Sequence, residues 1–191
     1  MRSFKVLIAC ILLWSTQAAA DNPVVEMKTS VGTLRFELFA DKAPKTVANF
    51  LQYVNEGTYA GTQFHRVIPD FMIQGGGFDR EFRQKPTRPP VENEAGNRLK
   101  NEVGTLAMAR TSNPHSATIQ FFINVANNAA LDFREPSTAG FGYAVFGKVT
   151  QGMDVVMRIA RTPTGPGGPF RSDVPQQAVI IESVTQISDN K

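Results

Sequence analysis

The chain has 191 residues, enough for one domain that buries a core without help from disulfides or metals. With 42% hydrophobic and 19% charged residues, its composition is that of a folded protein and argues against intrinsic disorder. The net charge is only +3 and the sequence has no run of five or more basic residues, so nothing favours a nucleic-acid partner.

The first 20 residues predict a cleavable secretory signal peptide. Arg2 and Lys5 precede an apolar run over residues 6–14, and small residues at 18–20 offer a cleavage site. The run is too short to span a bilayer core of about 30 Å, so we expect no membrane attachment after cleavage. The mature domain would be residues 21–191, located in the periplasm or, alternatively, fully secreted. Loss of two basic residues would lower its net charge from +3 to +1.

Two alternatives concern this N-terminal segment. Cys10, the only cysteine, resembles a lipoprotein processing site, but cleavage there would leave a very short apolar run before it. A buried N-terminal helix is the other alternative. If cleavage follows residue 20, the mature chain has no cysteine and is indifferent to the redox state of its compartment.

Residues 23–39 predict a β-hairpin. The segment 24–29 is rich in strand-forming residues, and Ser-Val-Gly at 30–32 supplies turn chemistry. Over residues 33–38 apolar and polar side chains alternate, which is the period of a half-buried strand.

Residues 44–56 predict an amphipathic helix. Apolar residues at 47, 50, 51 and 54 follow the spacing of one helical face. Pro44 suits the first turn, Asp41 is a plausible N-cap, and Gly57 marks the end.

The remaining chain is dominated by strands. A second helix is predicted at 153–160, and the Pro- and Gly-rich segments 86–90 and 162–169 are predicted to be loops. Six further strands are predicted at 63–67, 71–75, 105–109, 120–124, 143–149 and 178–187. Eight short strands with two helices indicate an all-β-dominated fold, a closed eight-stranded antiparallel β-barrel capped by two α-helices. Side chains just fill a barrel of this size, so a binding site would lie on its outer surface.

Several kinds of chemistry have no support. His65 and His115 are the only histidines, and without a mature cysteine they do not make a transition-metal site. The sequence has no Gly-x-Ser-x-Gly motif, and the glycines at 75–77 are not followed by the Lys-Ser or Lys-Thr of a phosphate-binding loop. We expect no cofactor and no metal. The triple glycine, which closes the strand 71–75, is interpreted as a bulge or a close backbone approach.

Strand alternation groups a set of apolar and polar side chains. In three strands it places five residues on one sheet face, while His65 points to the other face. Each has an ordinary interpretation, as a core residue, a solvated amide or a surface charge, and alternation alone does not decide between this and a functional patch. The five are Arg66, Met72, Gln74, Gln120 and Phe122.

The same residues carry a resemblance to a known family. FHRVIPDFMIQGGGF at 64–78 closely resembles the main signature of the cyclophilins, and QFFI at 120–123 and VFGKV at 145–149 resemble two more blocks in order. The likeness extends from about residue 24 to 187, and the run from 142 to 149 resembles the bacterial periplasmic branch. It implies an eight-stranded barrel closed by two helices and peptidyl-prolyl cis–trans isomerase activity.

The resemblance also implies roles by position. Arg66 matches the catalytic arginine, and Phe71, Gln74 and Phe122 complete the catalytic set. The resemblance implies four kinds of substrate-binding residue. These are a histidine at the rim, residues that complete the walls of the proline pocket, a second glutamine that binds the peptide backbone, and the end of a strand that holds the residue before proline. They are His65, Met72, Leu131, Tyr143, Gln120, Ala109, Arg110 and Thr111.

Three positions depart from the family pattern. Ala130 stands where many relatives carry Trp or Phe, which implies weakened cyclosporin binding. Tyr143 stands where many carry histidine, and it could close the pocket by packing and a phenol hydrogen bond. Arg110 is an asparagine in many relatives.

The implied reaction needs no covalent intermediate. Rotating an Xaa-Pro bond costs roughly 18–20 kcal/mol, so uncatalysed exchange takes tens of seconds or longer. A fixed guanidinium such as Arg66 can donate to the twisted amide more strongly than to the planar one. His65 at the rim could fulfil its role in the neutral form, so we expect the rate of isomerisation to depend only weakly on pH near neutrality.

The expected partners are proline-containing peptides and unfolded exported proteins, with the chain acting as a monomer. A non-catalytic proline-peptide binding module or chaperone is the alternative, and a purely structural barrel is a third hypothesis. Arg66, Gln74 and Phe122 favour the enzyme, whereas Ala130 keeps the binding module open.

Overall fold

The computed structural model of the chain describes residues 22–187, so the predicted signal peptide at 1–20 lies outside the described residues. Two α-helices, α1 (Pro44–Asn55) and α2 (Met153–Ala160), and two short 3₁₀ helices, η1 (Ala95–Asn97) and η2 (Ala129–Leu131), accompany ten strands. The strands are β1 (Val24–Thr29), β2 (Gly32–Leu38), β3 (Thr62–Ile68), β4 (Met72–Asp79), β5 (Thr105–Met108), β6 (Phe121–Asn124), β7 (Val145–Gln151), β8 (Thr164–Gly167), β9 (Phe170–Pro175) and β10 (Ile180–Ile187).

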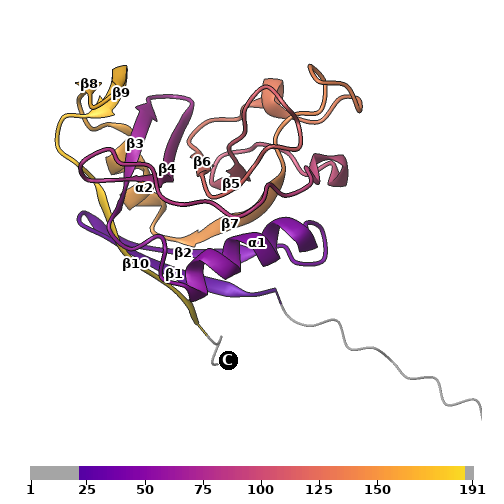
Figure 1. Ribbon diagram of the computed structural model, residues 1–191, viewed down its shortest axis with the longest axis horizontal. Coiled ribbons are helices and arrows are strands. Elements are labelled where there is room, and N and C mark those ends of the chain that lie inside the picture. The colour runs from indigo at the N-terminus through magenta and orange to yellow at the C-terminus, as the bar shows by residue number, and fades with distance from the viewer. Residues whose placement is uncertain (1–21, 188–191) are drawn as a thin grey trace, which may run out of the picture.

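Eight of these strands close into an antiparallel barrel in the order β1-β10-β3-β4-β6-β5-β7-β2. The predicted fold is therefore confirmed. The predicted bounds of the eight strands and two helices agree within two residues, except at the end of β4. Figure 1 shows α1 lying along one side of the barrel, and the long loops between β4 and β7 gathered above it. Within residues 22–187, no helix is long and apolar enough to cross a membrane.

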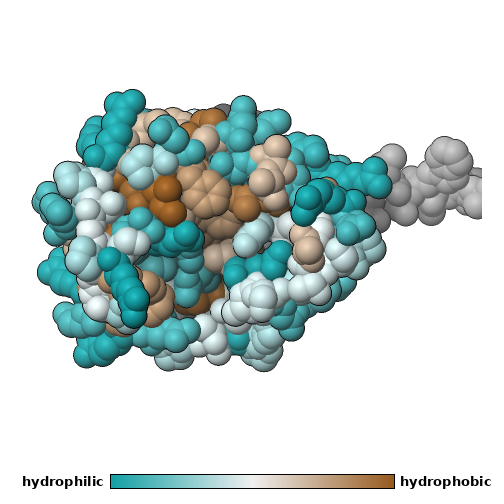
Figure 2. Space-filling model, turned by 90° about the horizontal axis from the view of Figure 1, so that it is seen from above, coloured by the Kyte–Doolittle hydropathy of each residue, from teal (hydrophilic) through white to brown (hydrophobic). Residues whose placement is uncertain are grey.

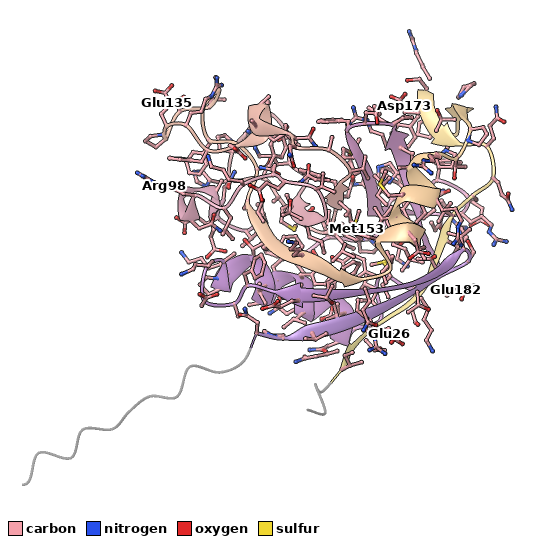
Figure 3. All side chains as sticks on the ribbon, turned by 180° about the vertical axis from the view of Figure 1, so that it is seen from behind. Glu26, Arg98, Glu135, Met153, Asp173 and Glu182 are labelled. Atoms are coloured by element: carbon pink, nitrogen blue, oxygen red, sulfur yellow. The ribbon has the colours of Figure 1, made fainter. Side chains whose placement is uncertain are left out.

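Aromatic side chains fill the barrel. Phe121 of β6 meets Phe50 of α1, Tyr59 and Phe64 edge-on, with ring centroids 5.6–6.1 Å apart. Figure 3 shows how densely side chains occupy the space between the strands. Because neighbours in a strand point to opposite faces, burial of Phe121 inside the barrel turns Phe122 to the outside. This alternation is what places an aromatic floor on the outer surface.

Helix α1 is capped by a residue that lies far away in the sequence. The predicted cap, Asp41, is wrong, because the N-cap is Ala43 and has no side-chain hydrogen bond. The Glu94 carboxylate instead accepts hydrogen bonds from the backbone N–H groups of Lys45 and Thr46, at 3.1 and 2.8 Å. It also accepts from the Thr46 hydroxyl at 2.7 Å, so the loop before β5 is fastened to the start of the helix.

The triple glycine lies inside β4 rather than at its end. The predicted strand ends at residue 75, whereas β4 continues to Asp79. The predicted irregularity is confirmed, since the register with β3 shifts on both sides of Phe64. Gly76 has a φ of +85°, and a Cβ there would lie 2.8 Å from the Tyr59 ring. Glycine is needed at this position because the backbone bulges against buried rings.

The segment 162–169 is not only a loop, which corrects the prediction. It contains β8, which pairs with β9 in a separate two-stranded hairpin. The turn uses Gly168 at φ +49°, where a Cβ would overlap the Phe82 ring. Phe170 then packs on Phe78, with ring centroids 5.3 Å apart. The Gly- and Pro-rich composition that indicated a loop is in fact that of a tight hairpin held by aromatic contacts.

Candidate active site

A hollow of about 190 Å³ opens on the outer face of the barrel. Its floor is Phe122, whose neighbours across the sheet are Gln74 of β4 and Ala107 of β5. Figure 2 shows apolar atoms gathered in a hollow on one face of the molecule, ringed by hydrophilic residues. The hollow is lined by Arg66, Phe71, Met72, Gln74, Ala109, Arg110, Phe122, Leu131 and Tyr143.

Tyr143 forms the wall opposite Phe71 and Met72. Its ring meets Phe122 edge-on, with centroids 5.7 Å apart and planes at 78°. On its other side the Arg110 guanidinium lies 4.5 Å from the ring centroid, within cation–π range. The predicted packing of Tyr143 is therefore present, and the tyrosine is held between an aromatic ring and a cation.

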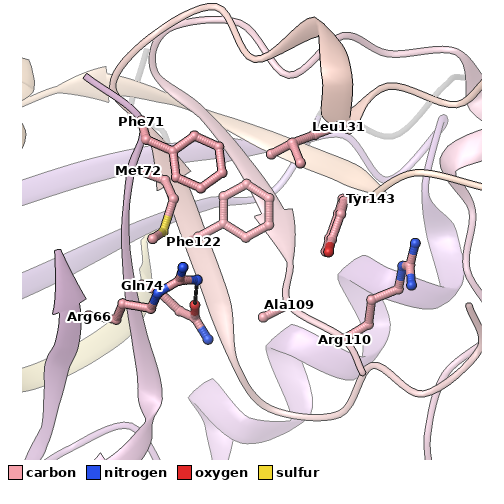
Figure 4. Close-up of a pocket in the computed structure, with 9 residues that line it drawn as sticks. All are labelled: Arg66, Phe71, Met72, Gln74, Ala109, Arg110, Phe122, Leu131 and Tyr143. Atoms are coloured by element: carbon pink, nitrogen blue, oxygen red, sulfur yellow. Dashed lines mark hydrogen bonds between the residues drawn. The ribbon is translucent and has the colours of Figure 1, made fainter. Parts of the chain in front are cut away.

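A chain of hydrogen bonds orients the polar side of the hollow. Arg66 Nη1 donates to Gln74 Oε1 at 3.5 Å, a long bond drawn dashed in Figure 4. Gln74 Nε2 in turn donates to Gln120 Oε1 at 2.8 Å. In the described residues Arg66 forms no ion pair, so its charge is free for a bound molecule. The three side chains come from three consecutive barrel strands or their ends, as alternation predicted.

Gly77 makes room for this chain, and sequence reasoning missed it. A Cβ at Gly77 would lie 2.4 Å from Gln120 Cγ, closer than real Cβ contacts permit. Close backbone approach was one predicted use of the triple glycine, but the sequence did not show which side chain would approach.

A buried amide network behind the hollow was also missed. Asn128 Nδ2 donates to the Phe71 carbonyl at 2.8 Å and to Asn124 Oδ1 at 2.7 Å. Asn101 Nδ2 donates to the Leu131 carbonyl at 3.1 Å, while the Asn101 backbone N–H donates to Asp132 Oδ1 at 2.8 Å. These bonds fix the backbone of residues on both sides of the hollow. The asparagines are spread over the sequence, and their spacing gave no signal.

A second hollow of about 190 Å³ continues from the first. The two share Gln74, Ala109 and Arg110, and the second is more polar in its residues. Its remaining lining is Gln84, Thr111, Ser116, Thr118 and Gln120. Two of the predicted binding residues, Thr111 and Gln120, therefore lie beside the apolar hollow and not in it.

His65 is the predicted site residue that the structure does not bring to either hollow. It lies at the irregularity between Phe64 and Arg66, is 2% exposed, and packs against Phe78 and Phe170. Its buried Nδ1 has no hydrogen-bond partner among residues 22–187. Burial, with a smaller contribution from the nearby Arg66 charge, lowers the pKa of His65 to about 4. The imidazole is therefore neutral at pH 7, and it is buried under the rings of Phe78 and Phe170 rather than lining a rim.

No group of three or more His, Cys, Asp or Glu side chains in the described part of the chain could hold a metal ion. The two hollows offer hydrogen-bond donors, aromatic faces and two arginine side chains, which suits an extended peptide with an apolar ring at its centre. The family model for "cyclophilin type peptidyl-prolyl cis-trans isomerase/CLD" matches residues 24–186. The chain belongs to this cyclophilin family.

Named relatives agree with this assignment. A "peptidyl-prolyl cis-trans isomerase" of Acinetobacter baylyi is 56% identical over 173 residues, covering 91% of this chain and 89% of the relative. The Escherichia coli "peptidyl-prolyl cis-trans isomerase B" is 56% identical over 162 residues, covering 85% and 98%. The predicted cyclophilin activity, peptidyl-prolyl cis–trans isomerisation, is confirmed at the level of the family.

A solved cyclophilin gives the same fold. The crystal structure of a Cryptosporidium parvum cyclophilin-type isomerase, in the presence of the dipeptide Ala-Pro, matches with a TM-score of 0.70 at 28% identity. The match covers 87% of this chain and 99% of that one. In the present cyclophilin, eleven of the twelve predicted site residues line one of the two hollows, and His65 does not.

Proposed function

We propose that this cyclophilin accelerates the isomerisation of Xaa-Pro bonds in exported proteins while they fold in the periplasm. The family membership supports the reaction, and the signal-like composition of residues 1–20 supports the location. Proline isomerisation is slow enough to limit folding, so unfolded exported chains with exposed prolines are suitable substrates. Clients of this kind are proline-containing peptides and unfolded proteins, which an exposed hollow can receive.

The observation that carries the mechanism is an unpaired guanidinium at the edge of an apolar hollow. The proline ring sits on Phe122, between Met72 on one side and Tyr143 on the other. Arg66 then faces the prolyl nitrogen, whose lone pair develops only as the amide twists. A donor aimed at that lone pair binds the transition state more strongly than either ground state, which is the condition for rate acceleration. No covalent bond is made or broken.

The proposed orientation of the peptide follows from the two connected hollows. The backbone on the N-terminal side of the proline lies along the strand end at Ala109–Thr111, with its preceding residues beside the polar hollow. Gln74 and Gln120 bind the peptide backbone, and Gln74 also orients Arg66. The support is the hydrogen-bonded order Arg66–Gln74–Gln120 across the boundary of the two hollows.

The proposed mechanism is nearly independent of pH around neutrality. The residues lining the hollows include no His, Asp or Glu, and an arginine keeps its charge throughout this range. His65 titrates near pH 4 and touches neither hollow. A steep change of rate governed by one group near pH 6.5 would contradict this mechanism.

Cyclosporin binding is proposed to be weak. Ala130 is exposed on η2, next to the hollow residue Leu131, and presents only a methyl group at the rim where an aromatic ring would add contact area. Replacing it in Ala130→Trp is expected to strengthen cyclosporin binding, measured as inhibition of peptide exchange.

The decisive experiment measures cis–trans exchange of a short Xaa-Pro peptide by the protein recovered after expression with its own N-terminal segment. Intact mass and cell fractionation of that protein test cleavage before Asp21 and periplasmic export. Removing one preorganised donor commonly costs about 10²–10³ in rate, so Arg66→Ala is expected to lose about a hundredfold in kcat/KM. Arg66→Lys keeps the charge but loses the planar fork, and it is expected to recover only part of the activity.

Phe122→Ala is expected to raise KM, because it removes the floor on which the proline ring packs. Circular dichroism and thermal unfolding show whether each variant is folded. A folded wild-type protein that binds the peptide but leaves its exchange rate unchanged would refute the enzyme and support a binding module.

A further inference from the structure

The two hollows carry positive charge that nothing in the site neutralises. Their fourteen lining residues include Arg66 and Arg110 and no Asp or Glu. Neither arginine forms an ion pair in the described part of the chain. Arg83, in the loop after β4, by contrast has its charge balanced by Asp79 and Glu81. The site is therefore a local region of positive potential on a protein of small net charge.

Arg110 is held in place before any ligand arrives. Its Nε donates to the Gly142 carbonyl at 2.9 Å, and its Nη1 donates to the Thr111 carbonyl at 2.9 Å. The face of the guanidinium rests on the Tyr143 ring, as Figure 4 shows, and the residue is half-buried. Backbone carbonyls and a ring fix its orientation but do not cancel its charge, and Nη2 has no hydrogen-bond partner among the described residues.

This arrangement suits recognition of a carboxylate. A fixed guanidinium loses little rotamer entropy on binding, and charge-assisted hydrogen bonds are stronger than neutral ones. Arg110 lies where the apolar hollow meets the polar one, beside the strand end proposed to hold the residues before proline. Arg66, by contrast, is bonded to Gln74 and is assigned to the twisting amide.

We propose that the site favours substrates with an acidic side chain two positions before the proline, and that Arg110 is the residue that selects it. This proposal rests on the proposed function and its peptide orientation. It adds a substrate class, acidic Xaa-Xaa-Pro segments, that the isomerase reaction does not itself require. Because Arg110 is only half-buried, its ion pair with the acidic side chain should contribute the small free energy of a surface ion pair rather than that of a buried one.

The test compares peptides that differ only two positions before the proline, where Glu, Gln or Lys is placed. This position leaves the residue adjacent to the isomerising bond unchanged. At low salt and pH 7, kcat/KM for the Glu peptide is expected to exceed that for the isosteric Gln peptide about two- to fivefold. The Lys peptide is expected to fall below both. In 1 M salt, where the screening length falls to about 3 Å, the ratio should approach one.

Variants assign the selectivity to a residue. In Arg110→Gln the Glu-to-Gln ratio is expected to fall to one, whatever happens to overall activity, because the ratio is taken within one variant. Arg161→Gln makes the same charge change at an exposed position at the end of α2, away from both hollows, and is expected to keep the ratio. Arg110→Lys retains the positive charge and is expected to keep part of the preference for the Glu peptide. A peptide with Glu two positions after the proline controls for long-range attraction and is expected to show less than half the enhancement.

Three results would overturn the proposal: a wild-type ratio of one, a ratio that survives in Arg110→Gln, or an equal enhancement on the far side of the proline. Failure of the proposed function looks different, because no peptide would then be accelerated. In that case the dissociation constants of the same Glu and Gln peptides, measured by calorimetry, still decide whether Arg110 selects acidic segments. If Arg110→Gln does not fold, the comparison of wild type with Arg110→Lys and the salt dependence decide it.

Discussion

Gly77→Ala tests whether the row of hydrogen-bonded side chains Arg66, Gln74 and Gln120 contributes to catalysis. Gly77 has no left-handed φ, so alanine introduces no backbone strain there. Its new Cβ would, however, lie 2.4, 2.5 and 2.6 Å from Gln120 Cγ, Cδ and Nε2. Because the Gln120 side chain is the flexible partner in this contact, it is the group that must move. The substitution therefore displaces one amide at the site without touching Arg66 or the aromatic floor.

The expected magnitude follows from the bond that is lost. Moving Gln120 breaks the 2.8 Å hydrogen bond from Gln74 Nε2 and leaves Gln74, and through it Arg66, less firmly oriented. A single neutral hydrogen bond contributes about 0.5–1.5 kcal/mol. If all of it acts in the transition state, kcat/KM for an Xaa-Pro peptide falls about two- to tenfold. The free energy of unfolding should change by less than about 1 kcal/mol, because a mobile side chain can relax.

The assay is a double-mutant cycle on peptide exchange. Gly77→Ala and Gln120→Ala are each expected to slow exchange, and Gly77→Ala should have no further effect once Gln120 is already alanine. Gly96→Ala is the matched control, because no atom lies within 4 Å of the position of its Cβ and its φ is ordinary. Full activity of a folded Gly77→Ala variant, or additive losses in the double variant, would refute the reasoning.

Three further predictions concern stability and the scaffold of the site. The pKa of His65 is about 4 in the folded state against 6.5 for a free histidine, so folding with the neutral imidazole is favoured above pH 6.5. Up to about 3 kcal/mol of the free energy of unfolding should be lost as the pH falls from 6.5 towards 4. In His65→Phe this acid-side loss, measured by denaturant unfolding at several pH values, should be smaller, and an unchanged pH profile would contradict the assignment. Glu94→Ala removes the acceptor for the first turn of α1 and should cost about 1 kcal/mol in urea unfolding, with peptide exchange unaffected. Asp132→Ala leaves the buried Asn101 N–H without its acceptor and should lower the free energy of unfolding by about 1–3 kcal/mol. It should also raise KM for the peptide by loosening the backbone at Leu131. A loss of stability with KM unchanged would show that the amide network is structural only.

The parts of the fold and site that follow a short period could be predicted from the sequence. Alternation along β6 separated Phe121 from Phe122, and the structure places one in the core and the other on the floor of the hollow. The same period of two placed Arg66 and Gln74 on one sheet face, and the two residues are paired across β3 and β4. It also grouped Phe64 with Arg66, which is wrong, because a bulge between them leaves Phe64 in the barrel core. Strands could be located for the same reason, because side-chain direction in a strand depends only on near neighbours.

The features that could not be predicted depend on partners distant in the sequence. Glu94 caps a helix that begins 50 residues earlier, and local rules pointed to Asp41 instead. Phe170 covers His65 from the second strand of a hairpin whose first strand lies in the segment 162–169, which composition alone described as a loop. Position in a motif suggested that His65 lines a rim, but burial depends on what packs over it. Such contacts are set by tertiary structure, and neither propensity nor spacing encodes them.

Because side chains fill the interior of the barrel, the hollow proposed to receive the proline ring lies on the outer surface and opens to solvent. A bound polypeptide can therefore approach sideways at any point along its chain, and neither of its ends has to be threaded through an opening. An enclosed cavity would admit only short peptides or chain termini. Under the proposed function, the size of the client therefore sets no limit on the reaction, and a proline in the middle of a large protein is as accessible as one near a chain end once local unfolding exposes its neighbours.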